Sequence, residues 1–501
     1  MRRDKREDEL IKSFLQMEGE GVDTYRRETP IEIRPQDLSP QWLDAVIAAE
    51  ALSAIKDMEG GRFQQDKRLR LTIGNGHGIS VVMDAAVEEE VVPNVEGASV
   101  IPIAIENSRV LYWREVLRSA VRASAHHDRA RTETSLLYEH PSIVTAVDAI
   151  EKITAEGRKV LVFGRFTRPM KALEEILNAR AMLRHLAEER VWPQSTIAQG
   201  DEVAVDAALA QMRLDSRWSR ADVSKLLGER YSSYETRRKA PLDRVHRVID
   251  REISGLAPRS RTVLAGAVLD ILETGGFEVG DDDIAEAARR IVESLCDDDT
   301  VLNGYGVNEQ EHDDVQDGRL QGKIDERIQE EYGIPRGGYA RRLYGETKPH
   351  TRRNLQLKFN RANCFPYVLI AQSQVGREGL NLHEQCRDVV LLHPEWNPGV
   401  VEQQIGRVDR LGSRWCKDFD VWKEAGAVGE PPRIEIRPIM FMGTYDEHNW
   451  SVLKRRWELL RGQLHGIVVS GADMRESGDA DKCIAAELNN LAPKLSPRSA
   501  D

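Results

Sequence analysis

The sequence has few cysteines, no long apolar run and no apolar leader at its start. Its five cysteines, among 501 residues, show no Cys-x-x-Cys spacing and have no paired histidines beside them. This spacing argues against a structural zinc site and favours a reduced, cytoplasmic location. The apolar runs fall well short of the ~20 residues that a membrane-spanning helix requires, and Arg2 to Glu9 is charged throughout. We therefore expect a cytoplasmic protein that makes no contact with a membrane.

The sequence also has no excess of positive charge. Its 83 acidic residues outnumber its 71 lysines and arginines, which gives a formal net charge of −12. A chain with this balance is not coated with basic surface, so any contact with nucleic acid must be local, as in a cleft. Its length leaves room for about two to four domains with ample apolar cores.

Two short apolar runs mark the most informative part of the sequence. Tyr367 to Ala371 and Asp388 to Leu392 are nearly continuous in apolar residues, which is typical of strands buried on both faces. Between them, Gly376 and Gly379 permit a tight turn and a close approach of the backbone to a ligand. The pattern predicts two buried strands and a ligand-facing loop.

A helix is predicted shortly after the second run. Pro398 and Gly399 are start signals, and the spacing predicts a helix from Val400 to Leu411 that Gly412 closes. The residues expected to face inward are Val401, Ile405 and Val408.

The same helix is expected to carry three polar side chains on one face. Gln403, Arg407 and Arg410 lie four and three residues apart, so they can project into one cleft. A guanidinium is always charged and forks onto phosphate oxygens, which lysine cannot do. The alternative is a surface helix whose arginines form ion pairs. Asp409 would then be a plain surface carboxylate, whereas in a phosphate site it would hold the arginines in register. The glycine-bearing loop and the block Glu395-Trp-Asn-Pro398 favour the phosphate site.

These motifs, in this order, resemble the second helicase lobe of superfamily 2 enzymes. The resemblance is to the Swi/Snf-like branch that includes the RNA-polymerase-recycling translocases. Ser373 to Leu382 is similar to the family's fifth motif, and Gln403 to Arg410 is similar to its sixth, Gln-x-x-Gly-Arg-x-x-Arg. Glu395-Trp-Asn-Pro398 resembles the Asp-x-x-Trp-Asn-Pro block with the acidic position shifted.

Further segments extend the resemblance over roughly residues 155–182 and 336–466. They are Lys159 to Thr167, similar to the strand that opens the lobe; Leu343 to Thr347 with Arg352 and Phe359-Asn360, similar to its strand–glycine–helix unit; and Gly443 to Glu447 with Trp450 to Leu464, similar to the brace that follows. The resemblance implies an α/β fold: a RecA-like parallel sheet flanked by helices and interrupted by a large helical insertion. A small β-containing segment is expected near the N-terminus.

Two features of an autonomous enzyme of this family are missing. One is the phosphate-binding loop Gly-x-x-x-x-Gly-Lys-Ser/Thr, and the other is an acidic magnesium-binding box after a strand. The pair Gly322-Lys323 is followed by Ile324, and Gly74 to Gly78 lies between two alternating runs, as a hairpin turn does. We therefore expect half of a two-lobed motor that begins just after a missing first lobe.

The resemblance implies that ATP and Mg are held mainly by a first-lobe partner with a phosphate loop. Arg407 and Arg410 would stabilise charge on the transferred phosphoryl group as arginine fingers, and Gln403 would position the attacking water or the arginines. The residues expected beside the nucleotide are Gly379, Asn381 and Gly406. Those expected at the nucleic-acid backbone, DNA or else RNA, are Arg165, Thr167, Ser373 and Gln374.

The chain is expected to divide into six stretches. These are connector-like helices and a strand at 1–60; a small α+β insertion at 61–140; the first part of the lobe at 141–182; a helical insertion with an acidic linker at 183–335; the second part of the lobe, with motifs five and six and the brace helix, at 336–466; and a polar tail at 467–501. Within the first stretch, Pro30 to Arg34 is a predicted strand, and Ser39-Pro40 caps a helix that runs to Lys56.

The insertion at 183–335 carries a concentration of basic residues. Its predicted helices are one that starts at Ser219 and others at Leu242–Leu256, Ser260–Thr274 and Asp283–Leu295. The basic residues are Arg237-Arg-Lys239, Arg244, Arg247 and Arg251, beside Tyr231 and Tyr234. They would either contact a nucleic-acid backbone or form a solvated, ion-paired helix surface.

Three functions stay open. The leading one is the C-terminal lobe of an ATP-dependent DNA helicase or translocase, which hydrolyses ATP only together with a first-lobe partner. The second is a non-catalytic nucleic-acid-binding or scaffold protein derived from a helicase lobe, and the third is a truncated helicase. ATPase activity with and without a first-lobe chain separates the first function from the second.

Overall fold

The structure is a computed structural model in which the described residues form two compact units. The described residues are 25–58, 137–253, 256–272, 280–296, 338–345, 349–362, 364–373, 380–393 and 397–465, with short pieces within 112–120 and at 325, 328, 347, 395, 483–484 and 487–488. Unit 1 comprises Met1–Ala149, Val162–Met170 and Arg387–Asp501, and unit 2 comprises Ile150–Leu161 and Lys171–Cys386.

The strands form a seven-stranded sheet in the order β1-β7-β6-β3-β5-β4, with β2 also paired to β7. They are β1 (Arg26–Glu28), β2 (Ile31–Ile33), β3 (Lys159–Gly164), β4 (Ala340–Leu343), β5 (Val368–Gln372), β6 (Cys386–Leu391) and β7 (Ile434–Phe441). The pairs β1–β7, β2–β7, β6–β7 and β4–β5 are parallel. All of β3 and most of β5 and β6 are buried, as in parallel sheets covered on both faces. The predicted α/β fold, a parallel sheet flanked by helices, is confirmed.

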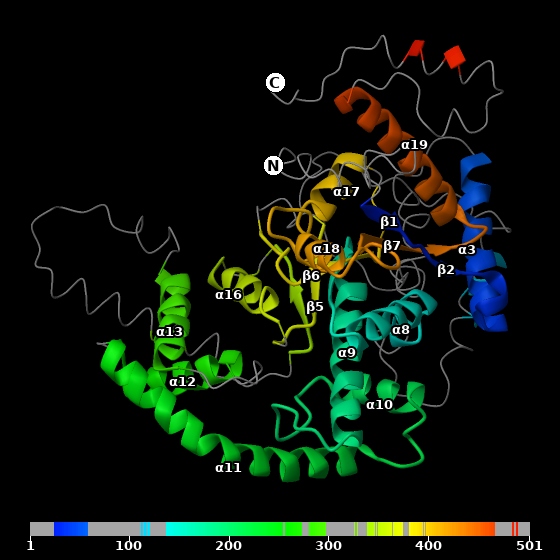
Figure 1. Cartoon of the computed structure of the whole chain (residues 1–501). Helices are drawn as coiled ribbons and strands as arrows, with labels where there is room; N and C mark the ends of the chain where they lie inside the picture. Colours follow the sequence, from blue (N-terminus) through cyan, green and yellow to red (C-terminus); the bar gives the residue numbers. More distant parts are fainter. Residues whose placement is uncertain are drawn as a thin grey trace, which may run out of the picture. The chain divides into compact units, whose positions relative to one another are not determined.

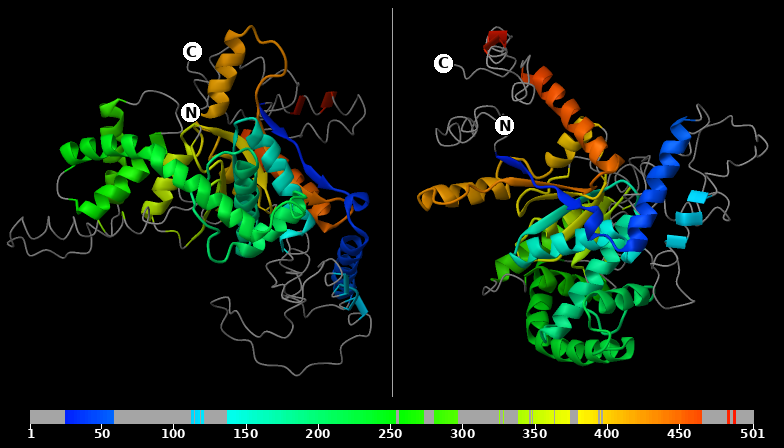
Figure 2. Two further views of the ribbon diagram at one scale, coloured as in Figure 1. Left: turned by 90° about the horizontal axis from the view of Figure 1, so that it is seen from below. Right: turned by 90° about the vertical axis from the view of Figure 1, so that its right-hand side faces the viewer.

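In unit 1, the first two strands of the described chain pair with its last strand. Strands β1 and β2 lie beside β7, with Arg26 opposite Ile434 and Ile31 opposite Ile439 (Figure 2). The helices of this unit include α3 (Pro40–Met58), α17 (Pro398–Ile405), α18 (Arg414–Glu424) and α19 (Tyr445–His465). Helix α19 packs against α17 and β7 (Figure 1). The strand predicted at Pro30 to Arg34 and the helix after Ser39 are confirmed by β2 and α3.

Unit 2 is held together partly by a buried lysine. The Lys159 ammonium, at the start of β3, donates hydrogen bonds to the carbonyl oxygens of Lys358 at 3.1 Å and Cys364 at 2.7 Å. It also lies 5.4 Å from the ring centroid of Phe359, the last residue of α16 (Pro349–Phe359). Burial lowers the pKa of Lys159 to about 8. The lysine therefore ties β3 to the end of α16 and to the loop that leads into β5.

A long helix packs along β4 in the same unit. Helix α9 (Thr167–Ala187) follows β3, and α8 (Pro141–Ala155) precedes it. The Asn178 side-chain amide donates to the carbonyl oxygen of Ala340 and accepts from its N–H, both at 3.0 Å. Arg342 of β4 pairs with Glu174 at 2.7 Å. These contacts fix the helix against the strand.

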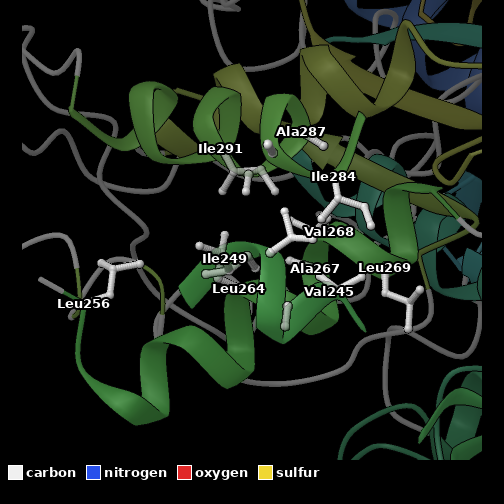
Figure 3. Close-up of a cluster of buried hydrophobic side chains, with 14 of the residues drawn as sticks. Val245, Ile249, Leu256, Leu264, Ala267, Val268, Leu269, Ile284, Ala287 and Ile291 are labelled. Atoms are coloured by element: carbon white, nitrogen blue, oxygen red, sulfur yellow. The ribbon is translucent and has the colours of Figure 1, made fainter. Parts of the chain in front are cut away.

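The described residues of the insertion include four helices of unit 2. They are α10 (Glu202–Gln211), α11 (Arg220–Glu252), α12 (Pro258–Leu272) and α13 (Asp281–Cys296). Ser219 and Asp222 form a capping box at the start of α11, each side chain accepting the other residue's backbone N–H. The C-terminal part of α11 packs with α12 and α13 around an apolar core that includes Val245, Leu264 and Ile284 (Figure 3). This core makes the three helices one packed body.

Two helix predictions are wrong in extent. A new helix was expected to begin at Leu242, but α11 runs through Pro241 without a break. Proline removes one helical hydrogen bond, and packing of the C-terminal part against α12 and α13 outweighs that loss. The second wrong prediction concerns α17, which ends at Ile405 instead of Leu411. The backbone N–H groups of Arg407 and Val408 donate to carbonyl oxygens three residues back, those of Gln404 and Ile405, which ends the α-helical pattern. The hairpin expected at 74–78 lies outside the described residues.

Among the described residues, no helix has both the length and the apolar character that crossing a membrane requires.

Helix α19 meets α3 at a pair of carboxylates, which makes the contact sensitive to pH. The backbone N–H of Tyr445 donates to the Glu50 carboxylate at 3.2 Å. Burial and then the charge of Glu50 raise the pKa of the neighbouring Asp446 side chain to about 7. Because this folded-state pKa lies above the unfolded value, the contribution of Asp446 is fully present below about pH 4 and is lost as the pH rises through 7.

We expect Asp446→Asn to remove this pH dependence. Between pH 5 and pH 8, the wild-type free energy of unfolding should fall by on the order of 1–3 kcal/mol more than that of the variant. Urea unfolding at the two pH values measures the difference. Equal changes in both proteins would show that Asp446 does not titrate in this range.

Candidate functional site

The site begins with a short helix that ends in a tight turn. The Asn397 side chain caps α17 by accepting the N–H of Gly399 at 2.8 Å, and Pro398 occupies the first turn. Val401, Ile405 and Val408 are fully buried, as predicted. Because the helix ends at Ile405, Arg407 and Arg410 lie on the turn beyond its C-terminus. The prediction that they share one helix face with Gln403 is therefore wrong.

Arg407 is a buried cation. Only 7% of the residue is exposed, and its buried Nε has no hydrogen-bond partner among the described residues. Burial and then the charge of Arg410 lower the pKa of the Arg407 guanidinium, which nevertheless stays charged. A buried charge without a counter-charge is unfavourable. An anion that binds from outside the described residues would therefore stabilise the buried Arg407 guanidinium.

The other motif-six residues surround this turn in different environments. Gln403 is exposed on α17, whereas the next residue, Gln404, is buried. The Arg410 Nε donates to the Gly406 carbonyl oxygen at 3.3 Å. A Cβ added to Gly406 would lie 3.0 Å from the Glu402 carbonyl oxygen, so a larger residue would require this carbonyl to shift by a few tenths of an ångström. The turn thus brings Gly406, Arg407 and Arg410 together and leaves Gln403 facing solvent.

Asp409 is held by an arginine that the sequence did not mark. Arg26 of β1 pairs with Asp409 at 2.7 Å and with Glu402 at 2.9 Å, and its own side chain is only 6% exposed. Tyr25 donates to the same Asp409 oxygen at 2.7 Å. Asp409 is therefore not a surface carboxylate. These contacts anchor Asp409 to β1. That it also holds Arg407 and Arg410 in register stays a prediction.

Helix α19 closes the same network from the other side. The Trp457 indole N–H donates to Glu402, the residue that also pairs with Arg26. About two turns earlier on α19, the Trp450 indole N–H donates to Glu28 of β1 at 2.7 Å. The brace helix, α17 and β1 therefore share one set of polar contacts beneath the arginine turn.

Two of the predicted nucleic-acid residues, Arg165 and Thr167, lie where β3 ends and α9 begins. Both are exposed. The backbone N–H of Arg165 donates to Nδ1 of His393 at 3.0 Å, and the His393 ring meets Phe166 edge-on. His393 is buried just after β6, so it fixes the backbone from which Arg165 projects.

In unit 2, the segment after β5 is fastened by the asparagine of the Phe359-Asn360 pair. The Asn360 amide donates to the Asn381 carbonyl oxygen at 2.7 Å and accepts the N–H of Glu384 at 3.3 Å. Ser373, which follows β5, is buried. Two further predicted site residues, Gln374 and Gly379, lie outside the described residues.

The glycine-bearing turn after β4 is closed by an arginine that the sequence had marked. The Arg352 guanidinium donates to the carbonyl oxygens of Gly345 at 2.6 Å and Thr347 at 2.7 Å. The predicted strand–glycine–helix unit is therefore present as β4, this turn and α16.

Comparison with known sequence families decides what this arrangement is. Residues 321–412 match the family described as "Helicase conserved C-terminal domain". The chain contains a C-terminal helicase lobe. The match ends at Gly412, so the helicase lobe includes β4, α16, β5, β6, α17 and the arginine turn.

Comparisons with individual proteins add less. The chain is similar to the crystal structure of the C-terminal part of the Fun30 ATPase domain. The match covers 67% of this chain and 96% of that chain, with 14% sequence identity and a TM-score of 0.19. No curated protein sequence matches the chain.

The described residues fit an anion better than a metal ion. They contain no group of three or more His, Cys, Asp or Glu side chains that could hold a metal. Arg407, by contrast, presents a desolvated guanidinium beside a second arginine.

Proposed function

We propose that this chain supplies the C-terminal lobe of an ATP-dependent DNA helicase or translocase of the Swi/Snf-like branch. It would complete a nucleotide site whose phosphate loop belongs to a separate first lobe. Arg407 is the observation that supports the proposal, because it combines the arginine position of motif six with burial and an Nε that lacks a partner among the described residues. The phosphates of ATP would supply the missing negative charge.

The roles of the site residues follow from their environments. When the lobes close on ATP, Arg407 and Arg410 would stabilise the charge that develops on the transferred phosphoryl group. Gln403, which faces solvent, is free to orient the attacking water or the arginines. Magnesium, when bound, would neutralise phosphate charge from the first lobe. Gly406 permits the turn that presents both arginines.

Other residues are proposed to contact nucleic acid or nucleotide. We propose that Arg165 and Thr167, exposed after β3, contact the nucleic-acid backbone in unit 1. Ser373 and Gln374 are proposed to do the same in unit 2. The residues proposed to lie beside the nucleotide are Gly379, Asn381 and Gly406.

The test is DNA-stimulated ATP hydrolysis by the full chain, measured alone and after mixing with a chain that carries a first lobe with a phosphate loop. We expect no hydrolysis by this chain alone and DNA-stimulated hydrolysis by the mixture. Hydrolysis by the chain alone would contradict a divided site. A mixture that forms a stable complex on DNA yet hydrolyses no ATP would favour the non-catalytic scaffold instead.

A further inference from the structure

Four arginines recur at every seventh position of α11. They are Arg230, Arg237, Arg244 and Arg251. An α-helix advances about 100° per residue, so each step of seven residues places the next side chain within about 20° of the previous one. The four therefore form one row along the helix, about 32 Å long at ~1.5 Å per residue. We refer to these four residues as the arginine row.

The arginine row is accessible to solvent. The Arg230, Arg244 and Arg251 side chains are 35%, 48% and 59% exposed, and Arg237 is exposed as well. From residue 228 to residue 244, a span that the structure describes in full, α11 has no buried residue. Leu242 packs against the core of the insertion, and the rest of this span is half-buried or exposed.

Arg238 connects the middle of this span to α12. Arg238 lies 4.8 Å from the ring centroid of Tyr234, and its Nη2 donates to the Gly266 carbonyl oxygen of α12 at 3.3 Å. The neighbouring Arg237 has no ion pair with any described residue. Arg238 therefore helps to hold α11 against α12, whereas the Arg237 guanidinium remains available to a ligand.

The ion pairs that the arginine row does make are exchangeable. Arg230 lies 3.6 Å from Glu189, Arg244 and Arg251 lie 2.8 Å and 3.9 Å from Asp281, and Arg251 also lies 3.0 Å from Glu252. The side chains of these three acids are 77%, 45% and 32% exposed, respectively for Glu189, Asp281 and Glu252. Exposed pairs of this kind contribute little to stability, so a ligand with denser negative charge can replace the carboxylates.

We propose that the arginine row binds the phosphate backbone of double-stranded DNA, outside the helicase motifs. A straight row of cations complements a straight polyanion, and duplex DNA carries one charge per ~1.7 Å of axis, or about 18 phosphates over the row. A small anion could engage only one arginine, and an acidic polypeptide has no fixed charge spacing.

The test measures binding of the full chain to a fluorescein-labelled 30-base-pair DNA duplex. Binding is detected as the fluorescence anisotropy of the duplex, in the absence of nucleotide and of a first-lobe partner. Because ATP hydrolysis plays no part, failure of the proposed function leaves this measurement interpretable. We expect Arg237→Ala to weaken binding about eightfold at 0.1 M salt and to reduce the slope of log K against log[salt] by about 0.9, the value for one lost phosphate contact. The variant should keep the wild-type unfolding midpoint, because Arg237 has no ion pair with a described residue.

Lys239→Ala is the matched control. Lys239 is exposed and lies two residues from Arg237, but about 200° around the helix, so this change removes the same charge from outside the arginine row. We expect a change of less than twofold. An equal loss in both variants would overturn the proposal. So would a wild-type chain that does not bind the duplex, or equal competition by polyglutamate of the same charge.

Discussion

Replacing Arg407 with methionine is expected to lower the kcat of DNA-stimulated ATP hydrolysis by on the order of 10³-fold or more in the complex with a first lobe. Methionine keeps much of the apolar stem but removes the guanidinium. The loss should appear in kcat and not mainly in KM, because the interaction strengthens as charge develops on the transferred phosphoryl group.

The same change is expected to leave stability intact or to increase it. Arg407 is a buried cation beside Arg410, and its Nε has no partner among the described residues, so the folded lobe carries a charge that the free chain does not compensate. Removing that charge relieves a desolvation cost. A raised urea midpoint together with lost activity is the signature of a group kept for function.

Arg414→Ala is the control for this prediction. Arg414 lies seven residues further along, is 41% exposed and pairs with Asp418 within α18. We expect its kcat to remain within about twofold of wild type, since an exposed pair of this type contributes little. A kcat for Arg407→Met within tenfold of wild type would contradict the assignment of Arg407 as an arginine finger.

The strands near the site were predictable because burial on both faces leaves a plain mark in the sequence. Lys159 to Gly164, Val368 to Gln372 and Cys386 to Leu391 are all nearly continuous in apolar residues. The inward positions of α17 followed from spacing alone. Strand β1, by contrast, reads Arg-Arg-Glu, and it forms because parallel pairing with β7 holds it in place. No local pattern carries that information.

The end of α17 shows where periodicity misleads. The helical spacing of Val401, Ile405 and Val408 continues past the point where the helix stops, because a tight turn also keeps Val408 buried. The identity of the arginines was visible in the motif, but the burial of Arg407 was not. Arg26, about 380 residues away in sequence, could be placed at the site only through the fold.

Arg26 is expected to be the residue whose loss destabilises unit 1 most. Its guanidinium, 6% exposed, pairs with both Glu402 and Asp409. Arg26→Met would leave two carboxylates that are 27% and 10% exposed without this counter-charge, and breaking a buried pair costs about 3–5 kcal/mol. Urea unfolding measures the loss. Arg34→Met, which removes an arginine that is 58% exposed and pairs with Glu32, should cost less than about 1 kcal/mol.

A second substitution shows whether Arg26→Met lowers stability through its unpaired carboxylates or through lost packing. If the unpaired carboxylates cause it, adding Asp409→Asn to Arg26→Met should restore part of the stability, whereas Asp409→Asn alone should destabilise. Because Asp409 lies between the two arginines of the turn, the double variant should remain less active than wild type even where its stability recovers. Additive losses in the two single variants would mean that Arg26 stabilises β1 by packing alone, and that the arginine turn is positioned without it.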